Sequence, residues 1–198
     1  MDFIKYTHPL LYKIKNAKLS KYPYPHSEIE DLLDYEIIEQ IDKNFPDFNA
    51  FNKNSDTNNV QIDSKKMNDE HQYDFRHILT LTDPKDLNKI ETEKKIFWEG
   101  LTKFLCSSDI IRGLLSFYSP YIEKRFGENL VNKKFKPSIM LLHDKAKYFL
   151  GPHTDHIKKV LTILIYLSNE NLSDKNSKFG TSIYFPKDQN FICEKGRH

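Results

Sequence analysis

The hydrophobic pattern of the chain changes after Gly127, and this change limits the folds that the sequence can adopt. Before Gly127, apolar residues such as Phe97, Leu101 and Phe104 recur three and four positions apart, which is the spacing of a helix with one buried face. After Gly127, apolar residues form short runs bounded by Gly, Pro, Asn, Asp or Lys, a pattern typical of strands and turns. Helices followed by strands predict an α+β fold.

Two helical regions are expected before this change. The first lies within residues 21–48, where apolar residues at helical spacing follow an extended, proline-containing stretch and end near Pro46. The second covers about residues 91–125, and the polar residues 107–109 offer an N-cap that would divide it into two helices. We interpret both regions as helices that build the core.

Residues 51–71 contain hardly any apolar side chains and many Asn, Asp and Ser residues. A loop of this length within a compact domain is a lid, a binding loop or a locally mobile segment, and we favour the mobile loop. The sequence therefore predicts a helical N-terminal support region over residues 1–127, with a mobile loop at about 51–71. A strand-rich core is expected over residues 128–198.

The composition excludes several classes of protein. A length of 198 residues favours one domain. The 30 Lys and Arg residues nearly balance the 28 Asp and Glu residues, so the formal charge of +2 provides no strong field that would attract nucleic acid or an anionic membrane. No stretch approaches the roughly 20 apolar residues that span a bilayer, and the two cysteines suit a reducing compartment. We therefore expect a cytoplasmic protein with neither nucleic-acid nor membrane partners.

His153 and Asp155 are the strongest candidates for metal ligands. Side chains alternate along an extended backbone, so two residues at i and i+2 project from the same face and can converge on one ion. Imidazole and carboxylate are two of the three ligands of the 2-His-1-carboxylate site that holds iron(II) in non-haem oxygenases. The same spacing also arises by chance, and the alternative is a structural or surface role. The adjacent pair His143 and Asp144 faces opposite ways on a strand and is not expected to chelate.

The context of this pair resembles the iron(II) and 2-oxoglutarate-dependent dioxygenases, in particular the prolyl 4-hydroxylase-like branch and its bacterial and phage relatives. The resemblance covers the chain from about Lys21 to its end and is carried by the segments YFLGPHTDHIKKVLTILIYLS, GTSIYFP, YPYPHSEIEDLL, FWEGLTKFL and LLHDKAKYFLGPH. It implies a jelly-roll-like, double-stranded β-helix backed by N-terminal helices. In that fold His153 and Asp155 would end the second core strand, and residues 160–167 would form a buried strand.

The resemblance also implies a reaction. Members of this family couple the decarboxylation of 2-oxoglutarate to the hydroxylation of a substrate, with iron(II), 2-oxoglutarate and ascorbate as a reductant. The expected substrate is a small molecule or a peptidyl residue, and no catalytic residue is expected beyond the metal ligands. Tyr148, Thr162 and Tyr166 are candidates for contacts with the cosubstrate, and the alternative is that they are wall or packing residues of the barrel.

The end of the chain departs from the family pattern. A second histidine ligand and a basic residue for the cosubstrate are expected on later strands, but only His198 follows, without an apolar strand around it. We interpret His198 as a frayed terminal residue, with the third iron ligand as the alternative, and expect a double-stranded β-helix that is incomplete at its C-terminus. The alternative function is therefore a truncated, inactive remnant or binding domain, which lacks the distal His and cosubstrate Arg and self-associates through an open sheet edge.

The other histidines and the early arginine carry weaker expectations. Arg76 is a candidate partner for a carboxylate of the substrate or cosubstrate, although a surface ion pair is the expected role. Four histidines in unpatterned contexts are expected to be exposed or locally hydrogen-bonded: His8, His26, His71 and His77.

Overall fold

The chain was analysed as a computed structural model that divides into two compact units. The first unit comprises Met1–Ala17 and Ile29–Leu150, and the second comprises Lys18–Glu28 and Gly151–His198. The structure describes residues 1–54, 75–127, 135–145, 148, 155, 158–167, 181–185 and 187. Most of the expected loop at 51–71, the expected ligand His153 and the terminal His198 lie outside the described residues.

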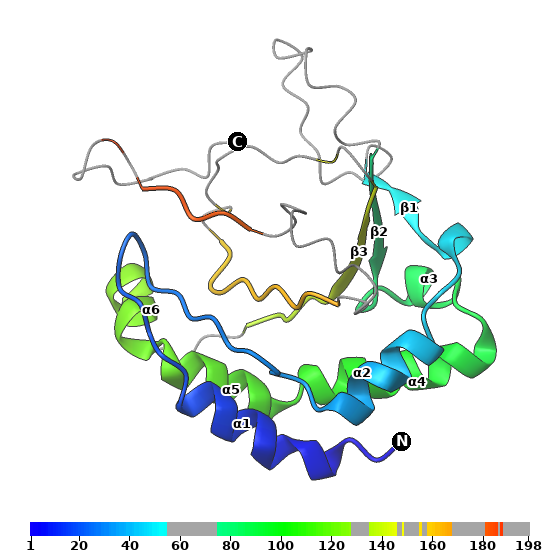
Figure 1. The fold of residues 1–198 in the computed structure, drawn as a ribbon, viewed down its shortest axis with the longest axis horizontal. Helices are drawn as coiled ribbons and strands as arrows, with labels where there is room; N and C mark the ends of the chain where they lie inside the picture. Colours follow the sequence, from blue (N-terminus) through cyan, green and yellow to red (C-terminus); the bar gives the residue numbers. More distant parts are fainter. Residues whose placement is uncertain are drawn as a thin grey trace. The chain divides into compact units, whose positions relative to one another are not determined.

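The helices belong to the first unit (Figure 1). They are the 3-10 helices η1 (Ile4–Tyr6) and η2 (Phe48–Ala50) and the α-helices α1 (Thr7–Lys15), α2 (Tyr35–Lys43), α3 (Pro84–Leu87), α4 (Thr92–Leu105), α5 (Ser108–Phe117) and α6 (Ser119–Phe126). The region predicted at about 91–125 is confirmed as helical, but it contains three helices, α4, α5 and α6, rather than the expected two, because a helix with proline in its first turn begins at Ser119. Ser107 takes the N-cap position of α5, as expected, but its side chain makes no capping hydrogen bond.

The helix expected within residues 21–48 is shorter than the run of apolar residues from which it was predicted. Asp34 ends the extended backbone, and its carboxylate accepts a hydrogen bond from the Glu36 backbone N–H at 3.1 Å, so α2 begins at Tyr35. Leu33, one residue before this cap, is buried all the same. The helical pattern therefore identified core residues correctly but placed the helix boundary too early.

A helix that the sequence reasoning did not anticipate, α1, packs along α5 (Figure 1). Its buried residues Leu10 and Ile14 lie four positions apart and form one face of the helix. The two helices approach closely at Gly113, where an added Cβ would overlap the side chain of Leu11. A glycine at this point therefore permits the close packing of α1 on α5.

The sheet of the first unit has three antiparallel strands in the order β1-β2-β3. The strands are β1 (Asn52–Lys53), β2 (Arg76–Thr80) and β3 (Met140–Asp144). Leu79 and Leu141 are opposite each other and buried in the core. His77, expected to be exposed or locally bonded, is only 4% exposed, because it lies on this same face of β2.

The predicted α+β class is confirmed, but the expected order of helices followed by strands was wrong: among the described strands β1 and β2 lie between α2 and α3, and only β3 follows Gly127. The reason is that β1 and β2 are short and pair with a strand distant in the sequence, which a local pattern does not reveal. The described residues contain this three-stranded sheet, which by itself is not a double-stranded β-helix. Residues 160–167 were expected to form a buried strand, and this expectation was wrong for burial: the Ile163 side chain is 48% exposed and Leu164 is 52% exposed. The expected strand is not seen either: residues 160–167 belong to no strand of the described part of the chain, so they present no sheet face that a second layer could cover.

Asp86 connects α3 with the sheet. One carboxylate oxygen accepts hydrogen bonds from Asn52 Nδ2 at 2.8 Å and from Lys89 Nζ at 2.7 Å. The other accepts from the Thr80 backbone N–H at 3.0 Å. Burial raises the pKa of Asp86, but the hydrogen bonds, led by that from Lys89, outweigh burial and hold the pKa below the ordinary value.

Replacing Asp86 with alanine is expected to lower the free energy of unfolding by about 1 to 3 kcal/mol, because the partly buried donors lose their acceptor. A carboxyl group with a depressed folded-state pKa stabilises the fold above its unfolded pKa, and the effect is lost as the pH falls through the folded-state pKa. The difference between wild type and variant in urea unfolding should therefore shrink below about pH 4. Asp42, exposed on α2, is the control, and its replacement by alanine should cost less than about 0.5 kcal/mol. Equal effects at the two positions would contradict the assigned role of Asp86.

Candidate functional site

Asp155 is held through both of its carboxylate oxygens. Oδ1 accepts a hydrogen bond from Lys159 Nζ at 2.8 Å, and Oδ2 accepts one from the hydroxyl of Thr162. The Asp155 side chain is 38% exposed and the Lys159 side chain is 56% exposed, so this ion pair is open to solvent. The two sequence candidates Asp155 and Thr162 are thus brought together in the second unit.

Tyr24 adds a phenol to the surroundings of Asp155. Burial, and then the negative charge of Asp155, raise the pKa of Tyr24, so the phenol lies within electrostatic reach of the carboxylate. The backbone carbonyl of Tyr24 lies 2.8 Å from His26 Nδ1, and the two rings are 5.3 Å apart between centroids. The expectation that His26 is locally hydrogen-bonded is confirmed.

Tyr166 does not contact Asp155 through any described hydrogen bond. Its hydroxyl instead forms a hydrogen bond with the hydroxyl of Thr181, and its side chain is 60% exposed. A second contact of the 181–185 segment joins Tyr22 and Phe185, whose stacked rings are 5.3 Å apart. The segments around residues 22, 166 and 183 are therefore linked by side chains within the second unit.

Tyr148, the third cosubstrate candidate, belongs to the first unit. The guanidinium carbon of Arg76 lies 4.0 Å from the centroid of the Tyr148 ring, which is a cation–π contact. Arg76 Nε and Nη2 also donate to the two carboxylate oxygens of Asp144, each at 2.6 Å. The expected ion pair of Arg76 is thus confirmed. Its guanidinium binds the carboxylate of Asp144, and not a carboxylate of a substrate or cosubstrate, in this structure.

Sequence reasoning missed Lys159 and Tyr24 as neighbours of Asp155. Lys159 lies four residues after Asp155 in a lysine pair, which gave no signal beyond a charged turn. Tyr24 is distant in the sequence, and only the repeated Tyr-Pro motif at residues 22–25 marked its segment. In the part of the chain that the structure describes, no three His, Cys, Asp or Glu side chains group around a point where a metal could bind.

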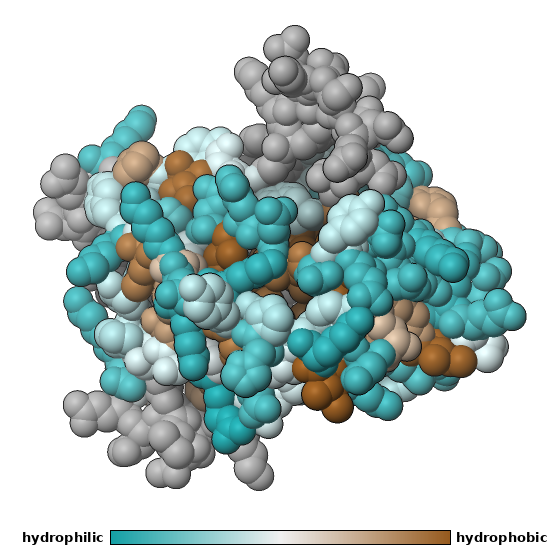
Figure 2. All heavy atoms as spheres, turned by 60° about the horizontal axis from the view of Figure 1, so that its bottom comes forward, coloured by the Kyte–Doolittle hydropathy of each residue, from teal (hydrophilic) through white to brown (hydrophobic). Residues whose placement is uncertain are grey.

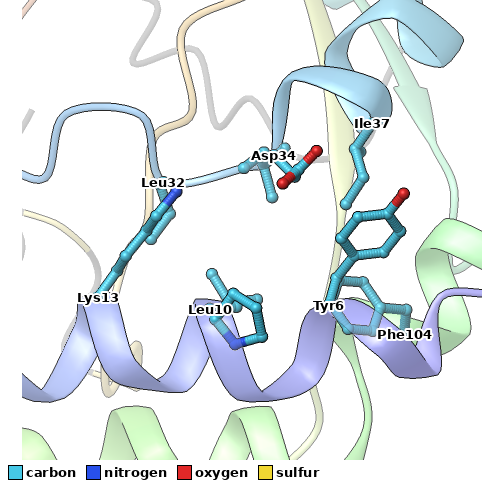
Figure 3. A pocket seen from close by; sticks show the side chains of 9 residues that line it. Tyr6, Leu10, Lys13, Leu32, Asp34, Ile37 and Phe104 are labelled. Atoms are coloured by element: carbon cyan, nitrogen blue, oxygen red, sulfur yellow. The ribbon is translucent and has the colours of Figure 1, made fainter.

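A small hollow lies between α1, α2 and α4 (Figure 3). Tyr6 approaches it from η1 and Leu10 and Lys13 from α1, while Ile37 and Phe104 approach from α2 and α4. Its volume is about 10 Å³, which is roughly the space that one water molecule needs. We therefore interpret it as a packing defect of the helices rather than a ligand site.

The surface is mixed in character. Figure 2 shows hydrophilic side chains over most of the face in view, with hydrophobic side chains between them. Each helix among the described residues is too short or too polar to cross a membrane.

Comparisons with protein-family models, curated proteins and solved structures found no match.

Proposed function

We propose that this chain is a non-haem iron(II), 2-oxoglutarate-dependent dioxygenase that hydroxylates a small-molecule or peptidyl substrate. The proposed fold of residues 128–198 is the first part of a double-stranded β-helix, and the proposed metal ligands are His153 and Asp155. The observation that supports this proposal most directly is the pair of contacts on the Asp155 carboxylate, from Thr162 and Lys159. Imidazole and carboxylate suit non-haem iron(II).

The contact from Thr162 is the kind that supports a metal ligand. A carboxylate that binds a metal through one oxygen is oriented by a hydrogen bond to its other oxygen. Thr162 donates to Oδ2, which leaves Oδ1 as the oxygen for the ion. This hydrogen bond favours orientation of Asp155 as the role of Thr162 over direct contact with the cosubstrate.

Lys159 would then act as the counter-charge of Asp155 when no ion is bound. Its ammonium lies 2.8 Å from Oδ1, the oxygen that the proposed ion would take. Because Lys159 is more than half exposed, its side chain can turn into solvent at little cost. Tyr166, in the same unit as Asp155, remains a proposed contact of 2-oxoglutarate through its hydroxyl.

Iron(II) with 2-oxoglutarate would supply the chemistry that turns dioxygen into an oxidant for an unactivated C–H bond, with ascorbate as a reductant. The chain would contribute binding and orientation. His153 and Asp155 would act as ligands, without a role in proton transfer, and would leave positions on the ion open for the cosubstrate and dioxygen.

The proposal predicts a visible charge-transfer band when iron(II) and 2-oxoglutarate are added to the protein without oxygen. The band should be lost in His153→Ala, because the ion loses an imidazole ligand. The matched control is His8→Ala, since His8 is exposed on α1 in the first unit, and this variant should keep the band. Identical spectra for wild type and His153→Ala would refute the assignment.

A second candidate, a binding domain without catalytic activity, is favoured by the exposed apolar side chains of the second unit. Ile163, Leu164 and Phe185 are 48%, 52% and 64% exposed, which is typical of surfaces that bind another chain when such residues are contiguous. Thermal unfolding separates the two candidates. A dioxygenase should show a higher unfolding midpoint with iron(II) and 2-oxoglutarate, because ligands that bind only the folded state stabilise it, whereas the binding domain should show no change.

A further inference from the structure

A pair of histidines lies across the sheet of the first unit, whereas the residues proposed for iron belong to the second unit. His77 on β2 and His143 on β3 are direct partners in the strand register. Directly opposite side chains on antiparallel strands project from the same face with Cβ atoms about 5 Å apart. The two imidazole rings are 6.5 Å apart between centroids, with an angle of 85° between their planes.

Two aromatic side chains pack against the pair. The centroid of Phe48 is 4.6 Å from that of His77 and 5.2 Å from that of His143, and Phe51 lies 6.1 Å from His143. His77 is only 4% exposed, while Phe48 is 46% exposed. His77 is therefore buried, His143 is half-buried, and the partly exposed ring of Phe48 packs against both imidazoles.

His143 has a buried ring nitrogen that needs a partner. Its Nδ1 is inaccessible to solvent and makes no hydrogen bond within the described part of the chain. A buried polar atom without a partner costs about 1 to 3 kcal/mol, and native proteins retain few such atoms. A metal ion bound to this nitrogen would remove that cost.

We propose that His77 and His143 form a two-histidine site for a divalent transition-metal ion of the class that prefers imidazole, such as Zn²⁺. With Zn–N bonds of about 2 Å, two imidazoles on one tetrahedral ion have centroids roughly 5 Å apart. The rings therefore have to approach by about 1 to 1.5 Å, which rotation of the two side chains provides. Water would fill the remaining positions on the ion.

The charged side chains around the two histidines determine how tightly the site should bind a divalent cation. Lys145 Nζ lies 4.8 Å from the Phe48 centroid, and Lys53 on β1 is the register partner of His77. Both lysines repel a dication, whereas Asp144 and Arg76 project from the opposite face of the sheet and pair with each other. The site should therefore be weak, and removal of Lys145 should strengthen it.

Zinc titration of the full-length chain without an affinity tag tests this site. All proteins carry Asp155→Ala, which removes the proposed iron site and keeps the two proposals separable. Calorimetry should show one bound Zn²⁺, weakened about tenfold or more by His143→Ala, strengthened by Lys145→Ala and unchanged by His8→Ala. The proposal would be overturned if the Asp155→Ala protein bound no zinc, or if it bound zinc with the same affinity as the protein that also carries His143→Ala.

A spectroscopic count of ligands keeps the test valid if the His143 variant fails to fold. Cu²⁺ binds imidazole sites more tightly than Zn²⁺, and its electron paramagnetic resonance spectrum reports the nitrogen atoms bound to it. One equivalent of Cu²⁺ on the Asp155→Ala protein should show two imidazole nitrogens, and on the His143→Ala protein one at most. A spectrum with no imidazole nitrogen on the protein that retains both histidines would overturn the site.

Discussion

Replacement of Trp98 by alanine is expected to lower the free energy of unfolding by about 3 to 5 kcal/mol, the largest stability effect predicted for this chain. Trp98 is 2% exposed, so alanine would leave a large cavity in the core. Its indole Nε1 also donates a hydrogen bond at 2.7 Å to the backbone carbonyl of Asn44, at the C-terminal end of α2. The residue thus fills the core and joins α4 to α2.

Two further variants separate these contributions in urea unfolding. Trp98→Phe keeps most of the apolar volume but leaves the Asn44 carbonyl without its donor, and should cost about 1 to 3 kcal/mol. Ile96, on the same helix and 69% exposed, is the control, and Ile96→Ala should cost less than about 0.5 kcal/mol. A Trp98→Ala protein as stable as Ile96→Ala would show that this core assignment is wrong.

Replacement of Thr162 by valine should weaken iron(II) binding by about tenfold to a hundredfold if Asp155 is a ligand. Valine has nearly the shape of threonine but no hydroxyl, so Oδ2 of Asp155 loses its hydrogen bond. The carboxylate would then be free to rotate away from the ion. Binding can be measured without oxygen by the charge-transfer band as a function of iron(II) concentration.

Thr181 provides a matched control for this experiment. Its hydroxyl is also exposed and hydrogen-bonded, but the partner is Tyr166 rather than Asp155. Thr181→Val should therefore bind iron(II) as the wild type does. If the two valine variants weaken iron(II) binding equally, or neither weakens it, Thr162 does not orient a metal ligand.

Local patterns in the sequence predicted those parts of the fold that depend on local contacts. Helices α4, α5 and α6 followed from apolar residues at helical spacing, and β3 followed from a short apolar run bounded by polar residues. The short α1 was missed because lysines and Pro9 interrupt its pattern. A helix of nine residues gains most of its stability from packing, and α1 packs on α5.

The candidate site was predicted in part for the same reason. Asp155 and Thr162 were both singled out from an expected strand, and their side chains do meet. The influence of Asp155 on Tyr24 joins segments far apart in the chain, and single-sequence periodicity carries no information on such pairs. Burial at residues 160–167 was misjudged. The hydrophobicity of a segment indicates that burial would be favourable, but it does not show which other segment packs against it.

A shift in the register of β2 and β3 would cost free energy, because the two faces of this strand pair carry different side chains. Arg76 and Asp144 form an ion pair on one face, while His77 and His143 lie against aromatic rings on the other. Because side chains alternate, a shift of one residue would turn Asp144 toward the aromatic rings and His143 toward solvent. Burial of a carboxylate without its partner costs several kcal/mol. A mispaired β2 and β3 would therefore be rejected during folding, although the chain between them, which contains α3, α4, α5 and α6, is too long to fix the register as a tight turn does.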